Sequence, residues 1–139
     1  MTTVKYLEQA KRFEFMIQNK SNEVERFKAM ATSITVAPKE DVIQSSGDKD
    51  KIGTLMAKVI DLENEVRVLT ESRDKIIKQI ESISDADMYQ IMYLKYIEDL
   101  SFSEIGRMIH YQKSSVVNKL KNALVIFEEK YGSQYLDIV

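Results

Sequence analysis

Cysteine and tryptophan are absent from this chain of 139 residues, which contains one proline and four glycines. Without cysteine, the chain cannot form a disulfide framework or a thiolate metal site. The scarcity of proline and glycine excludes collagen-like chains and disordered chains rich in these residues. No apolar run approaches the ~18–20 residues of a membrane span, and no basic-then-apolar segment opens the sequence as a signal peptide would. We therefore expect a cytoplasmic, mostly helical protein that makes no contact with a membrane.

The charges nearly cancel, with 20 lysines and arginines against 22 aspartates and glutamates and a net charge of −2. This balance argues against a nucleic-acid partner, because nucleic-acid-binding domains are usually basic. The distribution qualifies that argument, since residues 110–125 hold three lysines and no acid, whereas residues 85–109 hold two basic and five acidic residues. Because the local positive charge is small, one domain alone should bind DNA weakly and should need a second copy or tethering through another protein.

Two ladders of apolar residues, with the alternating three- and four-residue steps of a coiled coil, run through the N-terminal part of the chain. The first predicts a helix over residues 3–31, and the second predicts a longer helix over residues 49–83. Between them, residues 32–48 mix β-branched, small and turn-forming residues around Pro38, which predicts a linker. Two such helices joined by one loop indicate an antiparallel, coiled-coil-like hairpin over residues 1–84.

Each helix of the predicted hairpin presents one apolar stripe, which the other helix covers only in part. A further partner is expected for the remaining apolar surface, either a second copy of the chain or another protein. Lys20 and Arg73 occupy polar positions within the two stripes. Their long side chains can reach solvent from the seam, and a role in fixing register or selecting a partner is the alternative. Ser46 or Asp48 is the predicted N-cap of the second helix.

Residues 85–139 predict a smaller all-α domain with a helix-turn-helix pattern. Ser101 is the expected N-cap of its short central helix, and Glu104 is the reciprocal capping-box partner. Gly106 lies midway along this helix, where the absence of a side chain permits another helix to approach closely. A turn over residues 110–112 follows and leads into the last predicted helix.

That last helix, from Lys113 to about Phe127, has the composition expected of a DNA-reading helix. One face is apolar, and the other carries lysines, serines and asparagines. Amide and hydroxyl groups can donate and accept hydrogen bonds at base edges, and lysines can hold phosphates. Arg107 on the preceding helix is a further candidate for a phosphate contact. We call the candidate DNA-binding residues the predicted contact set: Arg107, Gln112, Lys113, Ser114, Ser115, Asn118, Lys119 and Lys121.

Residues 101–124, SFSEIGRMIHYQKSSVVNKLKNAL, resemble region 4 of bacterial sigma factors without gaps. The pattern of that family is S-x-x-E-I-A-x-x-L-G-x-S-x-x-T-V-x-x-x-L-x-x-A, and residues 92–99 are similar to the LRY-x-E-G segment that precedes it. Three departures from the pattern matter: Gly106 replaces alanine, His110 replaces the turn glycine, and Gln112 replaces a serine cap. The resemblance implies a DNA-binding helix-turn-helix with a less comfortable left-handed turn and a weaker cap on its second helix.

Over its whole length the chain resembles phage and prophage proteins of Gram-positive bacteria that join a helical N-terminal arm to a sigma-region-4-like domain. Segments such as YLEQAKR at residues 6–12, MATSI at 30–34 and QSSGD at 44–48 carry this likeness. These proteins are related in architecture to late-gene transcription activators of the RinA and ArpU type. The resemblance implies a phage or prophage transcription regulator whose partners are double-stranded DNA, RNA polymerase and a second copy of the chain. No sigma region 2 is visible, so we do not expect a complete sigma factor.

Two other functions stay open at this point. A DNA-packaging protein of the small-terminase type also joins a helix-turn-helix to an oligomerising helical region, and a closed ring of many subunits would favour it. A polymerase-binding adaptor without DNA contact would copurify with RNA polymerase and shift no DNA. The target site, the sign of regulation and the oligomeric state do not follow from the sequence.

Nothing in the sequence predicts an enzyme, a metal site or a cofactor. His110 is the only histidine, and without neighbouring metal ligands we interpret it as a turn residue. Asp85, Asp87, Glu98 and Asp99 fall at predicted helix ends, where capping and the helix dipole explain carboxylates. No glycine-rich phosphate loop, nucleophile motif or metal-ligand spacing is found.

Overall fold

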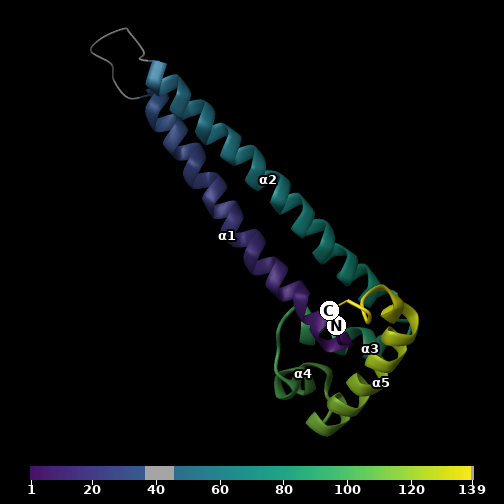
Figure 1. The fold of residues 1–139 in the computed structure, drawn as a ribbon. Coiled ribbons are helices and arrows are strands. Elements are labelled where there is room, and N and C mark those ends of the chain that lie inside the picture. The colour runs from purple at the N-terminus through teal and green to yellow at the C-terminus, as the bar shows by residue number, and fades with distance from the viewer. Residues whose placement is uncertain (37–45, 139) are drawn as a thin grey trace. The chain divides into compact units, whose positions relative to one another are not determined.

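A computed structural model describes residues 1–36 and 46–138 (Figure 1), and these residues form α-helices and no strands. The predicted all-α class is therefore confirmed for the described part of the chain. No helix in those two ranges is both long enough and apolar enough to span a membrane. In chain order the helices are α1 (Thr3–Val36), α2 (Ser46–Glu81), α3 (Ala86–Tyr96), α4 (Phe102–Ile109) and α5 (Lys113–Tyr131), followed by the short 3-10 helix η1 (Gly132–Gln134).

The two long helices extend further towards each other in sequence than predicted, so the predicted linker at 32–48 is too long at both ends. Helix α1 includes Thr32, whose hydroxyl donates a hydrogen bond of 2.9 Å to the carbonyl of Lys28. Such a bond allows a threonine to be accommodated within a helix. Helix α1 therefore continues through these β-branched residues. Residues 37–45, including Pro38, lie outside the described part of the chain, as do the side chains of the predicted caps at Ser46 and Asp48.

Contacts divide the chain into two compact units, which do not coincide with the predicted domains. We call residues 15–70 the hairpin unit, and residues 1–14 together with 71–139 the core unit. The predicted boundary at residue 84 falls inside the core unit rather than between the two units.

In the hairpin unit, α1 and α2 lie side by side in opposite directions (Figure 1). Lys28 pairs with Glu63 at 3.5 Å, and Lys20 pairs with Glu65 at 2.9 Å, so positions later in α1 meet positions earlier in α2. The predicted antiparallel hairpin is confirmed. Lys20 reaches from its seam position to a carboxylate of the other helix. Among the described residues of this unit, few hydrophobic side chains are buried: Val24, Ala31, Leu55 and Val59.

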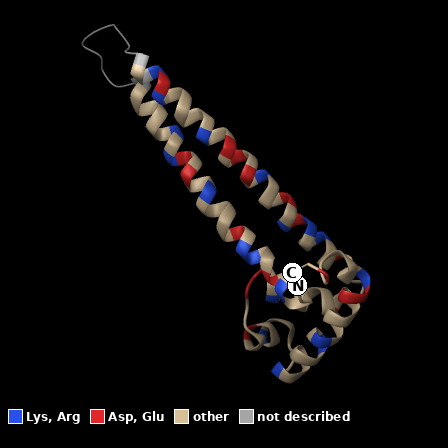
Figure 2. Cartoon of the chain, in the orientation of Figure 1, with Lys and Arg blue, Asp and Glu red and all other residues tan. Residues whose placement is uncertain are grey.

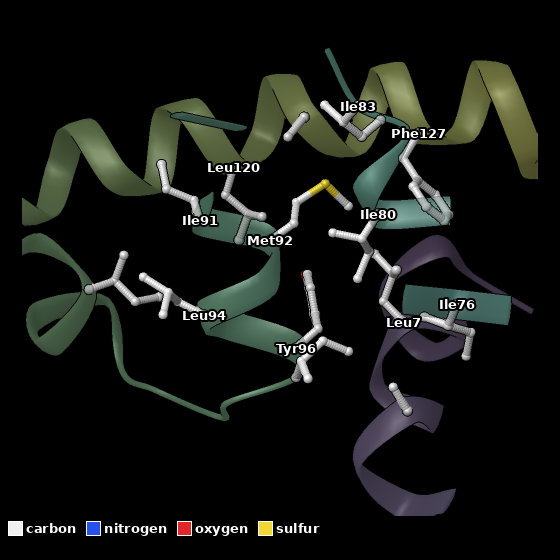
Figure 3. Close-up of a cluster of buried hydrophobic side chains, with 14 of the residues drawn as sticks. Leu7, Ile76, Ile80, Ile83, Ile91, Met92, Leu94, Tyr96, Leu120 and Phe127 are labelled. Atoms are coloured by element: carbon white, nitrogen blue, oxygen red, sulfur yellow. The ribbon is translucent and has the colours of Figure 1, made fainter. Parts of the chain in front are cut away.

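The core unit buries one continuous apolar cluster, to which the start of α1 and the end of α2 contribute (Figure 3). Figure 3 shows Leu7 of α1 and Ile76 and Ile80 of α2 beside Met92 of α3 and Phe127 of α5. A segment as small as α3 to α5 has little interior of its own, and its apolar faces share the cluster with residues of α1 and α2. The ends of α1 and α2 supply the missing surface, and for this reason they belong to the core unit. The buried members of the cluster are Leu7, Ala10, Ile76, Ile80, Ile83, Ile91, Met92, Leu94, Tyr96, Ile97, Ile105, Val116, Leu120, Ala123, Phe127 and Tyr135.

The chain after α5 also enters this core, through Tyr135. Its ring stacks on the ring of Tyr6 with centroids 4.2 Å apart, and its hydroxyl lies 2.8 Å from the hydroxyl of Thr3. The Tyr6 hydroxyl in turn donates to the side-chain carbonyl of Gln79 at 2.6 Å. Burial raises the pKa of Tyr135 above its usual value, although the bond with Thr3 acts the other way. The side-chain carbonyl of Gln134 accepts from the Gln79 amide at 3.1 Å, so Gln134 and Tyr135 together connect the start of α1 with the end of α2.

We predict that Leu7→Ala lowers the free energy of unfolding of the core unit by about 2–5 kcal/mol, because Leu7 is fully buried and its truncation leaves a cavity. Val4→Ala is the matched control one helical turn earlier, where the side chain is 38% exposed, and it should cost under about 1 kcal/mol. Urea unfolding followed by tyrosine fluorescence isolates this unit, since all seven tyrosines lie in it. Equal losses for the two variants would contradict the role given to α1 in the core.

Candidate functional site

The segment α4, residues 110–112 and α5 occupies the positions predicted for the helix-turn-helix. Helix α4 begins at the predicted cap, where the backbone N–H of Glu104 donates to the hydroxyl of Ser101 at 3.2 Å. The reciprocal contact of the predicted capping box, from the Glu104 side chain, is made to a different atom of Ser101. The Glu104 carboxylate accepts from the Ser101 hydroxyl at 3.1 Å, so both contacts of the pair pass through the serine oxygen.

The turn after α4 is left-handed at His110, which has φ 63° and ψ 41°. A non-glycine residue in this region costs about 1–2 kcal/mol, and glycine is the usual occupant. The turn is closed by the backbone N–H of Tyr111, which donates to the carbonyl of Gly106 at 2.9 Å. This bond, from the second residue after the helix end back into the last turn, is typical of a Schellman motif. The chain thus adopts the left-handed turn although His110 stands where the sigma-factor pattern has glycine.

Gly106 is required by this turn rather than by a neighbouring helix, which corrects the expectation from the sequence. A Cβ atom on Gly106 would lie 2.6 Å from the carbonyl oxygen of Tyr111, a backbone atom that cannot move alone. The side chain of Val116 on α5 would lie at 3.7 Å, an ordinary contact distance. The tight approach is therefore between α4 and its own turn.

Helix α5 packs one face against α3 and α4 and exposes the other. Val116, Leu120, Ala123 and Phe127 are buried, as their three- and four-residue spacing predicts. Gln112 is the N-cap, with extended backbone and no side-chain cap hydrogen bond. The weaker cap expected from the replacement of serine is confirmed. Backbone N–H groups in the first turn of α5 consequently have no side-chain cap.

The structure places most of the predicted contact set on one exposed surface. Ser114, Asn118 and Lys121 follow each other at steps of four and three, so they share one face of α5 at about 3.6 residues per turn. All three are exposed. Ser115 and Lys119, four residues apart, are partly buried on one flank of that face. The remaining members of the set are also exposed: Arg107 in the last turn of α4, Gln112 at the cap and Lys113 at the first position of α5.

One of these residues, Lys119, is already engaged inside the core unit. Its ammonium lies 3.6 Å from a carboxylate oxygen of Asp87 on α3 and 5.0 Å from the centre of the Tyr111 ring. The Tyr111 hydroxyl donates to the same Asp87 oxygen at 2.7 Å, and this hydrogen bond raises the pKa of Tyr111 above its usual value. We call these three side chains the Asp87 cluster.

Asp87 lies at a helix end, as predicted, but Asp85 is the residue that caps this helix. Asp85 caps α3, because its carboxylate accepts from the backbone N–H of Met88 at 2.9 Å. Asp87, two residues later in the first turn, turns its carboxylate to Tyr111 instead. Local sequence patterns carry no signal for this contact, because the two residues are 24 positions apart and belong to different elements.

Charge is distributed unevenly along α5, as Figure 2 shows. Lys113, Lys119 and Lys121 lie in its first half, and the first carboxylates come only at Glu128 and Glu129, close to its end. A polyanion would therefore be attracted to the first half of α5 more than to its end, where Glu128 and Glu129 outnumber Lys130. In the two described ranges, no group of three or more histidine, aspartate or glutamate residues is placed to hold a metal ion.

We predict that Gly106→Ala destabilises the core unit by about 1–3 kcal/mol, because the added methyl group would overlap the Tyr111 carbonyl. The matched control is Gly53→Ala in α2, where nothing lies within 4 Å of the added atom. There the better helix propensity of alanine should stabilise the protein by about 0.5–1 kcal/mol. Thermal unfolding followed by circular dichroism measures both changes, and the prediction fails if they have the same sign.

The site is thus an exposed helical face that begins at an uncapped helix start and carries amides, hydroxyls and ammonium groups. No protein-family model matches the chain. No curated protein and no solved structure matches it.

Proposed function

We propose that this protein is a sequence-specific DNA-binding transcription regulator of phage or prophage genes, with α5 as its reading helix. The observation that carries the proposal is the exposed stripe of Ser114, Asn118 and Lys121 on α5. No carboxylate interrupts the helix between Lys113 and Phe127. A short helix, a left-handed turn and such a helix are the parts from which helix-turn-helix proteins build their major-groove contact.

Each exposed group suits a particular part of the DNA. The Asn118 amide can donate to and accept from an adenine edge, and the Ser114 hydroxyl can bond to several bases. Lys113 and Lys121 stand at the start and side of the stripe, where phosphates flank the major groove. Arg107 adds a guanidinium from α4, and the backbone N–H groups at the start of α5 suit a phosphate oxygen.

The contact is confined to the first half of α5. Glu128 and Glu129 are exposed near its end, and carboxylates there would repel the phosphate backbone. Arg107, Lys113 and Lys121 leave about three phosphate contacts, for which the logarithm of the binding constant falls with the logarithm of salt with a slope of about −3. Binding by one copy is therefore weak at physiological salt, and a dimer or attachment to RNA polymerase would supply the rest.

The resemblance to sigma region 4 supports transcription, rather than another DNA transaction, as the process in which the protein acts. A second candidate is a polymerase-binding adaptor without DNA contact. It is favoured by Val125 and Ile126, which follow the polar stripe and are 57% and 40% exposed. Exposed apolar side chains next to carboxylates suit a protein surface better than a phosphate backbone.

We predict that Lys121→Met weakens binding to a duplex of mixed sequence and makes the salt slope less negative by about one, because one phosphate contact is lost. Lys5→Met is the charge-matched control, since this exposed lysine lies on α1 of the same core unit. Fluorescence anisotropy of a labelled duplex between about 50 and 200 mM salt measures both slopes. Identical slopes for the two variants would count against α5 as the contact helix.

Sequence reading is tested separately with Asn118→Ala on a target site obtained by chromatin capture. Loss of the amide should cost about 1–3 kcal/mol on that site and relax the preference at one base position, while binding to mixed sequence changes little. Full retention of the preference, with native circular dichroism, would refute the role of Asn118.

Copurification with RNA polymerase and no DNA shift by the unmodified protein would support the adaptor instead.

A further inference from the structure

The Asp87 cluster joins three elements on the surface of the core unit. Asp87 comes from α3, Tyr111 from the turn and Lys119 from α5. The side chains of Lys119 and Asp87 are 37% and 39% exposed, and Tyr111 is 38% exposed, so a ligand can reach all three. The cluster is therefore not buried as a structural ion pair would be, and its charged groups are already paired with each other.

Lys119 stands directly beside the proposed reading stripe. It follows Asn118 in sequence and is rotated from it by about 100° around α5. With Ser115 it forms one flank of the stripe, and Lys121 lies towards the other flank. A lysine on that flank is placed for a DNA phosphate, yet its ammonium lies against the Asp87 carboxylate.

We propose that Asp87 acts as an internal competitor of DNA phosphate for Lys119 and thereby lowers sequence-independent affinity. This inference rests on the proposed function of α5. The Tyr111 hydroxyl holds the carboxylate by its bond of 2.7 Å, and the Tyr111 ring lies under the ammonium. Asp87 thus offers Lys119 an anionic oxygen that is already in place before DNA arrives.

The contact of Lys119 with Asp87 and its contact with a DNA phosphate are close in strength. Competition between them therefore has a measurable effect on binding. An exposed ion pair shifts an equilibrium by at most about fivefold. One phosphate contact at 0.1 M salt contributes about eightfold through counterion release. Asp87 therefore cancels much of what Lys119 could add to phosphate binding. Base contacts from Ser114 and Asn118 are not affected, so a larger share of the affinity for a specific site comes from base contacts.

Asp87→Asn tests this inference, because asparagine keeps an oxygen that can accept from the Tyr111 hydroxyl but removes the charge. We expect affinity for a mixed-sequence duplex at 0.1 M salt to rise about two- to fivefold, with a salt slope more negative by about one. Adding Lys119→Met should remove this gain, and the loss should be larger in the Asp87→Asn background than in the unmodified protein. Glu98→Gln removes the same charge from an exposed carboxylate between α3 and α4 and should leave the slope unchanged.

The possible failures are distinguishable. If the unmodified protein binds with a slope near −3 and Asp87→Asn has the same slope or a lower affinity, the inference is overturned and the proposed function stands. The carboxylate would then serve only to position the turn. If neither protein binds DNA while tyrosine fluorescence shows a native core unit, the proposed function fails and the inference fails with it. An equal gain for Glu98→Gln would reduce the effect to net charge and would also overturn the inference.

Discussion

The burial of Leu7, Ile76 and Ile80 against Met92 and Phe127 is the contact on which the core unit depends. The start of α1 and the end of α2 cover apolar faces of α3, α4 and α5 in this cluster. The same contact holds α5 through Phe127, so the orientation of the proposed reading helix depends on residues from the opposite end of the chain. Folding of this unit consequently requires contacts between distant parts of the sequence, which have a high loop-closure cost.

The turn shows how a local departure from a common pattern is accommodated. A left-handed histidine costs about 1–2 kcal/mol, but the turn gains the bond from the Tyr111 N–H to the Gly106 carbonyl and brings the fully buried Ile105 and Val116 into the core. The close backbone approach then excludes a side chain at residue 106. Residue 106 is thus a glycine because the turn approaches it closely, and His110 adopts the strained left-handed conformation.

Local features of this fold could be predicted from the sequence, and non-local ones could not. The apolar ladders, the Ser101 cap and the buried positions of α5 each depend on residues within a few positions of one another, and these predictions are confirmed. The first helix continues past its predicted end because the weak helix propensities at residues 32–36 yield to continued helical hydrogen bonding. The stacking of Tyr135 and the bond from Tyr111 to Asp87 leave no pattern in the sequence, because each joins elements that meet only in the folded chain. The placement of the predicted contact set followed from helical periodicity, whereas the engagement of Lys119 did not.

Net charge is a poor guide to the proposed function because the position of each charge matters more than the sum. The chain carries −2 overall, yet α5 has three lysines before its first carboxylate. Its charges also differ in availability, since Lys121 is exposed whereas Lys119 rests on Asp87. In the proposed function, weak phosphate attraction has a benefit, because non-specific DNA is present in large excess and each phosphate contact strengthens binding to all of it equally. A reading helix with few available cations must obtain its remaining affinity from base contacts and from a second attachment.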